Sequence, residues 1–174
     1  MQDELGLGAA TAAWQLGKPG PLYASYRLLL VAKMVDRCIT RQLYDIVGIS
    51  LAEWRVLRQL YDSAEPASLR ELAETAWVDR AEVSRAVTTL VRRRFVQRRT
   101  NPEDRRSSLL TCTKQGRAAI DKILPQREYL HKRLTSRLSR AELEQFVETL
   151  LVIGQESIAI LEDSHPPPRR KRKR

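Results

Sequence analysis

The sequence has few of the residues on which catalytic and redox sites depend. Its 174 residues include two His and two Cys, and Cys38 and Cys112 lie far apart and form no Cys-x-x-Cys pair. The cysteine pattern therefore predicts neither a zinc site nor a disulfide framework and fits a reducing compartment. No Ser-His-Asp set, phosphate-binding loop or His-Glu-x-x-His motif can be assembled by spacing. We expect no enzymatic activity, no metal and no cofactor.

Long apolar runs are also missing. No apolar stretch approaches the roughly 18 residues of a membrane span, and the first residues lack the basic and apolar regions of a secretory signal. The sequence thus predicts a cytoplasmic protein without membrane contact. Hydrophobic residues nevertheless make up 43% and charged residues 30% of the chain, which is enough apolar surface for a folded core. The length fits one helical domain.

Positive charge is abundant and is confined to two places. Nine Arg and three acidic residues between positions 80 and 106 give +6, and all six residues of 169–174 are basic. Because the net charge is +10, the rest of the chain is slightly acidic, at −2. Such concentration predicts a surface that binds a polyanion. Nucleic acid is favoured over a membrane because the basic segment has no lipid-facing aromatic stripe.

Apolar spacing predicts a mainly helical chain with a small two-stranded β wing. A helix over 22–47 should end at Gly48, and Ser50, Ser68 and Asp79 are the predicted caps of the next three helices. Glu71 stands three residues after Ser68, as a capping box requires. A hairpin over 95–113 follows. Helical spacing then resumes, and the predicted helices are 114–134, broken or bent at Pro125, and a last one after Ser139.

This order of elements predicts a winged helix-turn-helix over 51–113. Residues 21–50 and 114–163 have more apolar side chains than the DNA-binding region of one chain could bury. We therefore expect a helical dimerisation region there. Residues 1–20 are interpreted as a flexible arm. Residues 164–174, with three Pro and the basic run, are interpreted as a disordered tail.

The helix expected after Asp79 carries the predicted DNA contacts. Its apolar positions, among them Val83 and Val87, take one side and leave hydroxyl and guanidinium groups on the other. In a winged helix-turn-helix this helix enters the major groove, where such groups can bond base edges or phosphates. The candidate residues are Arg80, Ser84, Arg85, Thr88, Thr89 and Arg92.

Four blocks, residues 51–57, 80–96, 101–106 and 111–117, resemble the multiple antibiotic resistance regulator (MarR) family. The wing block Asn101-Pro-Glu-Asp-Arg-Arg106 is the most specific of them. The resemblance, which covers about residues 22–161, implies a homodimer with intertwined first and last helices on a pseudo-palindromic double-stranded operator. It also implies that Asp104 braces Arg106 and that Arg105 or Arg106 approaches the minor groove.

The chain departs from the family pattern at two positions. Arg94 stands where the family usually has Gly after the recognition helix. Either it adopts a left-handed or bridge conformation, at a cost of about 1 kcal/mol, or the helix ends differently. Asn101 stands where the wing often begins with Asp, which keeps the turn but removes a charge.

The resemblance further implies a repressor, involved in aromatic compound catabolism, that a small aromatic acid releases from its operator. A hydroxybenzoate or hydroxypyridine-carboxylate is expected, with aromatic rings around the effector and Arg27 or His131 neutralising its carboxylate. For Trp54, a core anchor of its helix is the favoured interpretation, with stacking on the effector as the alternative. The candidate effector-binding residues are Tyr23, Tyr26, Arg27, Trp54, Trp77 and His131.

Two alternatives remain open at this point. The regulator could sense redox state through Cys38, although a small buried side chain is the favoured interpretation of that residue, and Cys112 is assigned packing only. The chain could also be a non-specific architectural DNA-binding protein whose basic tail supplies the affinity. Competition with random DNA separates the second alternative from a specific regulator.

Overall fold

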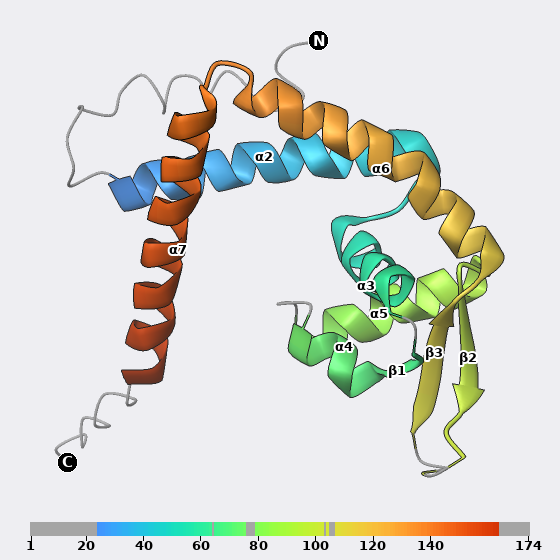
Figure 1. Ribbon diagram of the computed structural model, residues 1–174. Coiled ribbons are helices and arrows are strands. Elements are labelled where there is room, and N and C mark those ends of the chain that lie inside the picture. The colour runs from blue at the N-terminus through green and yellow to red at the C-terminus, as the bar shows by residue number, and fades with distance from the viewer. Residues whose placement is uncertain (1–23, 64, 76–78, 103, 105–106, 164–174) are drawn as a thin grey trace, which may run out of the picture. The chain divides into compact units, whose positions relative to one another are not determined.

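The computed structural model describes residues 24–63, 65–75, 79–102, 104 and 107–163. These residues form six helices and a three-stranded antiparallel sheet (Figure 1), which confirms the predicted mainly helical winged fold. The chain divides into two compact units after Arg127. The elements are α2 Ala24–Val47, α3 Leu51–Asp62, β1 Ala67–Ser68, α4 Leu69–Thr75, α5 Arg80–Arg92, β2 Val96–Thr100, β3 Ser108–Cys112, α6 Lys114–Thr135 and α7 Arg140–Asp163.

The predicted helix starts are confirmed by their caps. The Ser50 N–H donates to Glu53 Oε2 at 3.0 Å, and the Glu53 N–H donates to Ser50 Oγ at 3.2 Å, which makes a capping box at α3. Ser68 and Glu71 make the same reciprocal pair at α4. The hydrogen bond from the Ser68 backbone lowers the pKa of Glu71, because it favours the ionised carboxylate. At α5, the Asp79 side chain accepts from the Ala81 N–H at 3.0 Å.

Two left-handed residues end helices at the predicted positions. Gly48, at φ 67°, closes α2 with a hydrogen bond from its N–H to Tyr44 O. Arg94, at φ 61°, follows Arg93, the C-cap residue of α5. The Arg94 N–H donates to Val91 O and the Phe95 N–H to Leu90 O, each at 2.9 Å, which is the Schellman arrangement. Of the two alternatives for Arg94, the structure therefore has the left-handed conformation.

The hydrophobic core belongs to the first unit. It packs the inner faces of α3, α4, α5 and the first part of α6 against the sheet, and α2 contributes its last turns. Its fully buried large side chains include Leu43, Leu57, Leu72, Leu90, Leu110 and Ile120. Removing one of these would leave a cavity, and such changes typically cost about 2–5 kcal/mol.

The sheet has one strand more than the predicted hairpin. β2 and β3 pair with Val96 opposite Cys112 and Arg98 opposite Leu110, as the hairpin requires. β1 adds to the other edge of β3, with Ala67 opposite Leu110. A two-residue strand has no alternating pattern in the sequence, so only its pairing with β3 reveals it.

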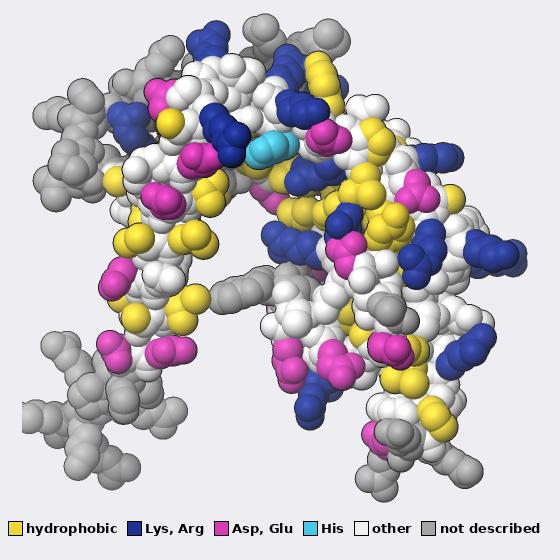
Figure 2. All heavy atoms as spheres, viewed as in Figure 1, with side chains coloured by type: hydrophobic (Ala, Val, Ile, Leu, Met, Phe, Trp, Pro, Cys, Tyr) yellow, Lys and Arg dark blue, Asp and Glu magenta, His cyan; other side chains and the backbone are white. Residues whose placement is uncertain are grey.

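α6 runs through Pro125 as one helix, so the break that was one of the two expectations there is wrong, while the bend stays a prediction. Within a helix, the proline ring removes the hydrogen bond that an N–H at this position would give to Asp121 O, and it crowds that carbonyl group. In the second unit, α7 has no buried residue, and Figure 2 shows hydrophobic side chains uncovered along it. Within the described residues, no helix is long and apolar enough to cross a membrane.

Candidate nucleic-acid interface

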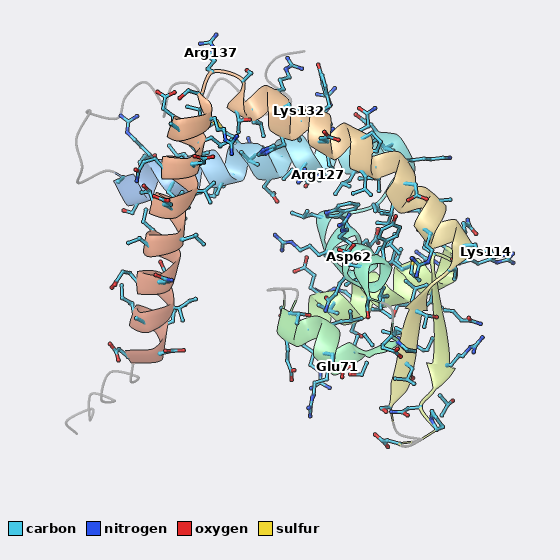
Figure 3. The ribbon with its side chains drawn as sticks, viewed as in Figure 1. Asp62, Glu71, Lys114, Arg127, Lys132 and Arg137 are labelled. Atoms are coloured by element: carbon cyan, nitrogen blue, oxygen red, sulfur yellow. The ribbon has the colours of Figure 1, made fainter. Side chains whose placement is uncertain are left out.

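The base of the wing is fastened to the end of α5 and to the first turn of α6. β3 leads directly into α6 at Lys114 (Figure 3). Between them, the Thr113 hydroxyl donates to Arg94 O at 2.7 Å and accepts from the Gly116 N–H at 3.0 Å. The Thr113 N–H donates to Phe95 O at 3.0 Å. These bonds fix where the wing begins relative to the end of α5.

α5 separates its apolar and polar side chains as predicted. Val83, Ala86, Val87 and Leu90 are buried in the core. Val91, also expected on this face, is only partly buried. The opposite side is therefore turned away from the core.

The six candidate residues of α5 lie on that outer side. Arg80, Arg85, Thr88 and Arg92 are exposed, while Ser84 and Thr89 are half-buried. The Thr88 hydroxyl donates its proton to Ser84 O at 2.8 Å. Its oxygen can still accept a hydrogen bond, and its methyl group can pack against a base.

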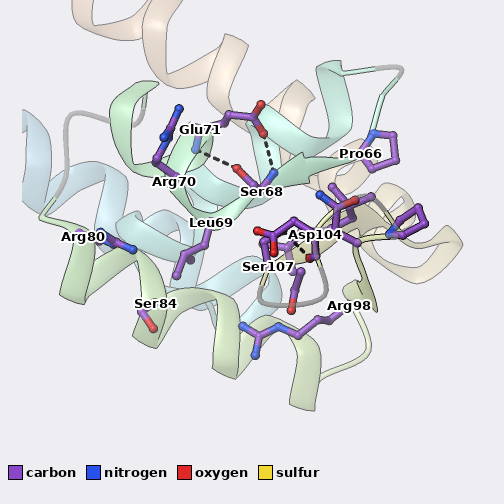
Figure 4. A pocket seen from close by; sticks show the side chains of 15 residues that line it. Pro66, Ser68, Leu69, Arg70, Glu71, Arg80, Ser84, Arg98, Asp104 and Ser107 are labelled. Carbon is purple, nitrogen blue, oxygen red and sulfur yellow. Dashed lines mark hydrogen bonds between the residues drawn. The ribbon is translucent and has the colours of Figure 1, made fainter.

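A hollow of about 800 Å³, here called the wing hollow, separates α5 from the wing. Arg80 and Ser84 border it from α5, Arg98 from β2 and Asp104 from the wing turn (Figure 4). Ser68 and Glu71 of the α4 cap complete one wall. Arginine side chains thus enter the wing hollow from both the helix and the wing.

The wing turn is closed by its own backbone. The Asn101 N–H donates to Ser107 O at 3.1 Å, and the Ser107 N–H donates to Asp104 O at 2.9 Å. Asp104 is exposed. Arg105 and Arg106 lie outside the described residues, so the brace expected between Asp104 and Arg106 stays a prediction.

Arg98 is a candidate that the sequence analysis missed. It lies two residues after the buried Val96 and opposite the buried Leu110, so strand alternation puts it on the face of the hairpin that Val96 occupies. Figure 4 shows its guanidinium extending towards α5. The period-2 spacing from Val96 was the signal available for finding it.

The effector candidates are distributed over several elements. Tyr26, which is exposed, and Arg27, which is half-buried, lie at the start of α2, and Trp54 packs against the core of the first unit. His131 is exposed on the part of α6 that belongs to the second unit. None of these four residues lines the wing hollow. Tyr23 and Trp77 lie outside the described residues.

The favoured interpretation of Cys38 as a small buried side chain is wrong for this chain, because Cys38 is exposed. The reason is that Cys38 lies about 140° around the helix from Leu43, the buried residue of α2, and so is on a different side of it. Cys112 is half-buried against the core, as expected for a packing role, and burial raises the pKa of its thiol.

The proteins that resemble this chain in sequence are helix-turn-helix transcriptional regulators. A MarR family profile matches residues 47–107. The uncharacterized HTH-type transcriptional regulator YdgJ of Bacillus subtilis (strain 168) is 29% identical over 77% of this chain and 84% of its own length. From the same organism, the regulator YxaD is 32% identical over 59% of this chain and 71% of its own length. The HTH-type transcriptional repressor YetL is 29% identical over 59% of this chain and 62% of its own length.

Two solved structures are similar in fold. Sco3205, a MarR family transcriptional regulator from Streptomyces coelicolor in complex with DNA, superposes with a TM-score of 0.66 at 21% identity, over 80% of this chain and 91% of that one. Bordetella bronchiseptica BpsR, whose DNA binding is regulated by 6-hydroxynicotinic acid, superposes with a TM-score of 0.68 at 25% identity, over 79% and 98%. Both the sequence relatives and the fold lead to one assignment: the chain belongs to the MarR family of transcriptional regulators.

Proposed function

We propose that the protein is a homodimeric repressor that binds a pseudo-palindromic DNA operator through α5 and the wing. The observation that carries the proposal is the outer side of α5, where arginines and Thr88 are exposed beside a wing that contributes Arg98. Arginine can donate two hydrogen bonds to a guanine edge, and hydroxyls can bond bases or phosphates. The DNA complex of Sco3205 and the name of YetL support the assignment.

Dimerisation of the regions 21–50 and 114–163 is part of the proposal. α7 exposes large hydrophobic side chains on more than one side, including Phe146 (47% exposed), Leu151 (61%) and Ile160 (65%). A helix that is apolar around most of its circumference is normally buried. A second copy of the chain, wrapping its own α2 and α7 around these, would cover such surface as an obligate interface does.

The test of base reading compares Arg85 with a wing arginine. Arg85→Ala is expected to weaken binding to the selected operator by about 1–3 kcal/mol per half-site, with a smaller effect on random DNA. Arg106→Ala should weaken specific and random DNA more nearly alike, because a minor-groove or phosphate contact is less sequence-dependent. Competition titrations at fixed salt measure both ratios.

Lys122→Ala, which removes one exposed positive charge from α6, is the matched control and should leave the ratio of specific to random affinity unchanged. Equal losses on specific and random DNA for Arg85→Ala would remove its role in reading bases. If the wild-type protein bound random and selected duplexes equally, the architectural alternative would replace the proposed function.

We propose further that a small aromatic carboxylate of the hydroxybenzoate or hydroxypyridine-carboxylate type releases the protein from DNA. The regulation of BpsR by 6-hydroxynicotinic acid supports this ligand class. Tyr26, Arg27, Trp54 and His131 remain the candidate contacts, together with Tyr23 and Trp77.

Linkage requires the operator to weaken acid binding by the same factor by which the acid weakens operator binding. This factor is about 5- to 150-fold for a typical coupling. Calorimetric titration of the free and DNA-bound protein with a panel of aromatic acids measures this factor, and equal affinities in the two titrations would refute the switch.

A further inference from the structure

Arg93 connects the end of the recognition helix α5 to the end of α2. It is the C-cap residue of α5, and its backbone N–H still bonds to Thr89 O within the helix. Its side chain turns to the other helix. Nη1 donates to Gly48 O at 2.6 Å and Nη2 donates to Val47 O at 2.5 Å, across 45 and 46 residues of sequence.

The charge of the Arg93 guanidinium complements that of the last carbonyl groups of α2. The last carbonyls of a helix lack partners inside the helix and carry the negative end of its dipole. The left-handed turn at Gly48 ends α2 here, and the Arg93 guanidinium, which is permanently charged, donates to two of its final carbonyls at once. Cζ of the same guanidinium lies over the Phe95 ring, 4.7 Å from its centroid.

The backbone around Arg93 is itself held in place. The hydrogen bonds from Arg94 and Phe95 back into α5 fix the turn that follows, and Phe95 is buried in the core. The side chain of Arg93 therefore extends from a rigid position on α5 to a rigid position on α2. A short connection between two rigid ends fixes how far α5 can turn or shift relative to α2.

We propose that Arg93 is a positioning residue that sets the placement of α5 relative to α2 and thereby the distance between the two recognition helices of the dimer. The inference rests on the proposed function, in which α2 belongs to the dimerisation region. In a symmetric dimer, the separation of the two recognition helices determines which spacing of half-sites fits both. Arg93 acts in this way without touching DNA, because its guanidinium is engaged by Val47 O, Gly48 O and the Phe95 ring.

The experiment measures how affinity depends on half-site spacing. Duplexes carry the half-sites that the protein selects from a random pool, at the selected spacing and with one or two base pairs added or removed. Each added pair displaces and rotates one half-site, so we expect the wild-type affinity to fall by about tenfold or more. With Arg93→Ala, affinity at the selected spacing should fall about tenfold, and the differences between spacings should shrink to about threefold or less.

Two further variants separate positioning from general stability. Arg93→Lys keeps the charge but not the planar, two-pronged donor, so an intermediate spacing profile is expected. Arg58→Ala is the matched control, because Arg58 is also half-buried, bonds Asp62 at 2.6 Å and lies over the Tyr61 ring, yet does not join α2 to α5. It should lower the melting temperature and leave the spacing profile unchanged.

The possible results test the positioning role of Arg93 separately from the proposed DNA-binding function. A wild-type spacing profile in Arg93→Ala would overturn the positioning role, and so would equal flattening by Arg58→Ala. If Arg93→Ala reduced the salt dependence of binding to random DNA by about one counterion, Arg93 would be a phosphate contact. That result would also overturn the positioning role. If the wild-type protein selected no paired half-sites, the proposed function would fail, and the positioning role with it.

Discussion

Replacing Leu151 and Ile160 of α7 by Glu is expected to make the protein a monomer and to lower its affinity for a paired operator by about 100- to 10,000-fold. Both side chains are more than 60% exposed in the chain alone and lie outside the hydrophobic core, so the substitutions leave that core intact. In the proposed dimer they would place charges in an apolar interface, where an unpaired charge is strongly destabilising. The affinity falls because the second half-site is no longer bound by a linked subunit.

Light scattering and gel-shift titration measure this prediction together. The wild-type protein should have twice the 20.0 kDa mass of the chain, and the double variant should have the mass of one chain. Glu156→Gln, a change at an acidic position of the same helix, is the control and should leave mass and affinity unaltered. A monomeric wild-type protein at micromolar concentration, or a dimeric double variant, would contradict the assigned interface.

Gly116→Ala is expected to destabilise the protein by about 3 kcal/mol or more, a large effect for a single methyl group. Gly116 is buried where the first turn of α6 crosses the base of the wing. An added Cβ would overlap the Phe95 carbonyl oxygen and would lie 2.9 Å from Cys112 Sγ. Because one of these groups is backbone, the wing and α6 would have to move apart.

Urea unfolding of the variant measures this cost. Gln115→Ala is the control, since Gln115 is exposed in the same helical turn and its truncation should change the free energy of unfolding by no more than about 0.5 kcal/mol. An equally stable Gly116→Ala protein would show that the wing and α6 are not held as closely as the hydrogen bonds of Thr113 indicate.

The parts of the fold that the sequence predicts well are those determined by neighbouring residues. The caps at Ser50, Ser68 and Asp79 depend on side chains within three residues, and the structure contains all three. The left-handed conformation of Arg94 was one of two outcomes that the family pattern implied, because the family usually has Gly at this position. The outer side of α5 could also be predicted, because a helical period of 3.6 residues separates its two faces.

The parts that could not be predicted depend on contacts between distant residues. β1 forms because Ala67 pairs with Leu110 of β3. A role for Arg93 can be inferred only from its hydrogen bonds to the carbonyls of Val47 and Gly48. No local pattern encodes such pairs. The prediction that Cys38 is buried was wrong for a related reason. The apolar positions of α2 indicate burial, but they do not indicate whether the same chain or a second copy buries them.

The most direct test of the account is to sequence the DNA that the wild-type protein selects from a pool of random duplexes at physiological salt. A dimer that inserts two copies of α5 into successive major grooves should enrich two inverted half-sites whose centres lie about 10 base pairs, or one helical turn, apart. Sequences without an inverted repeat, or no enrichment over the starting pool, would contradict the account.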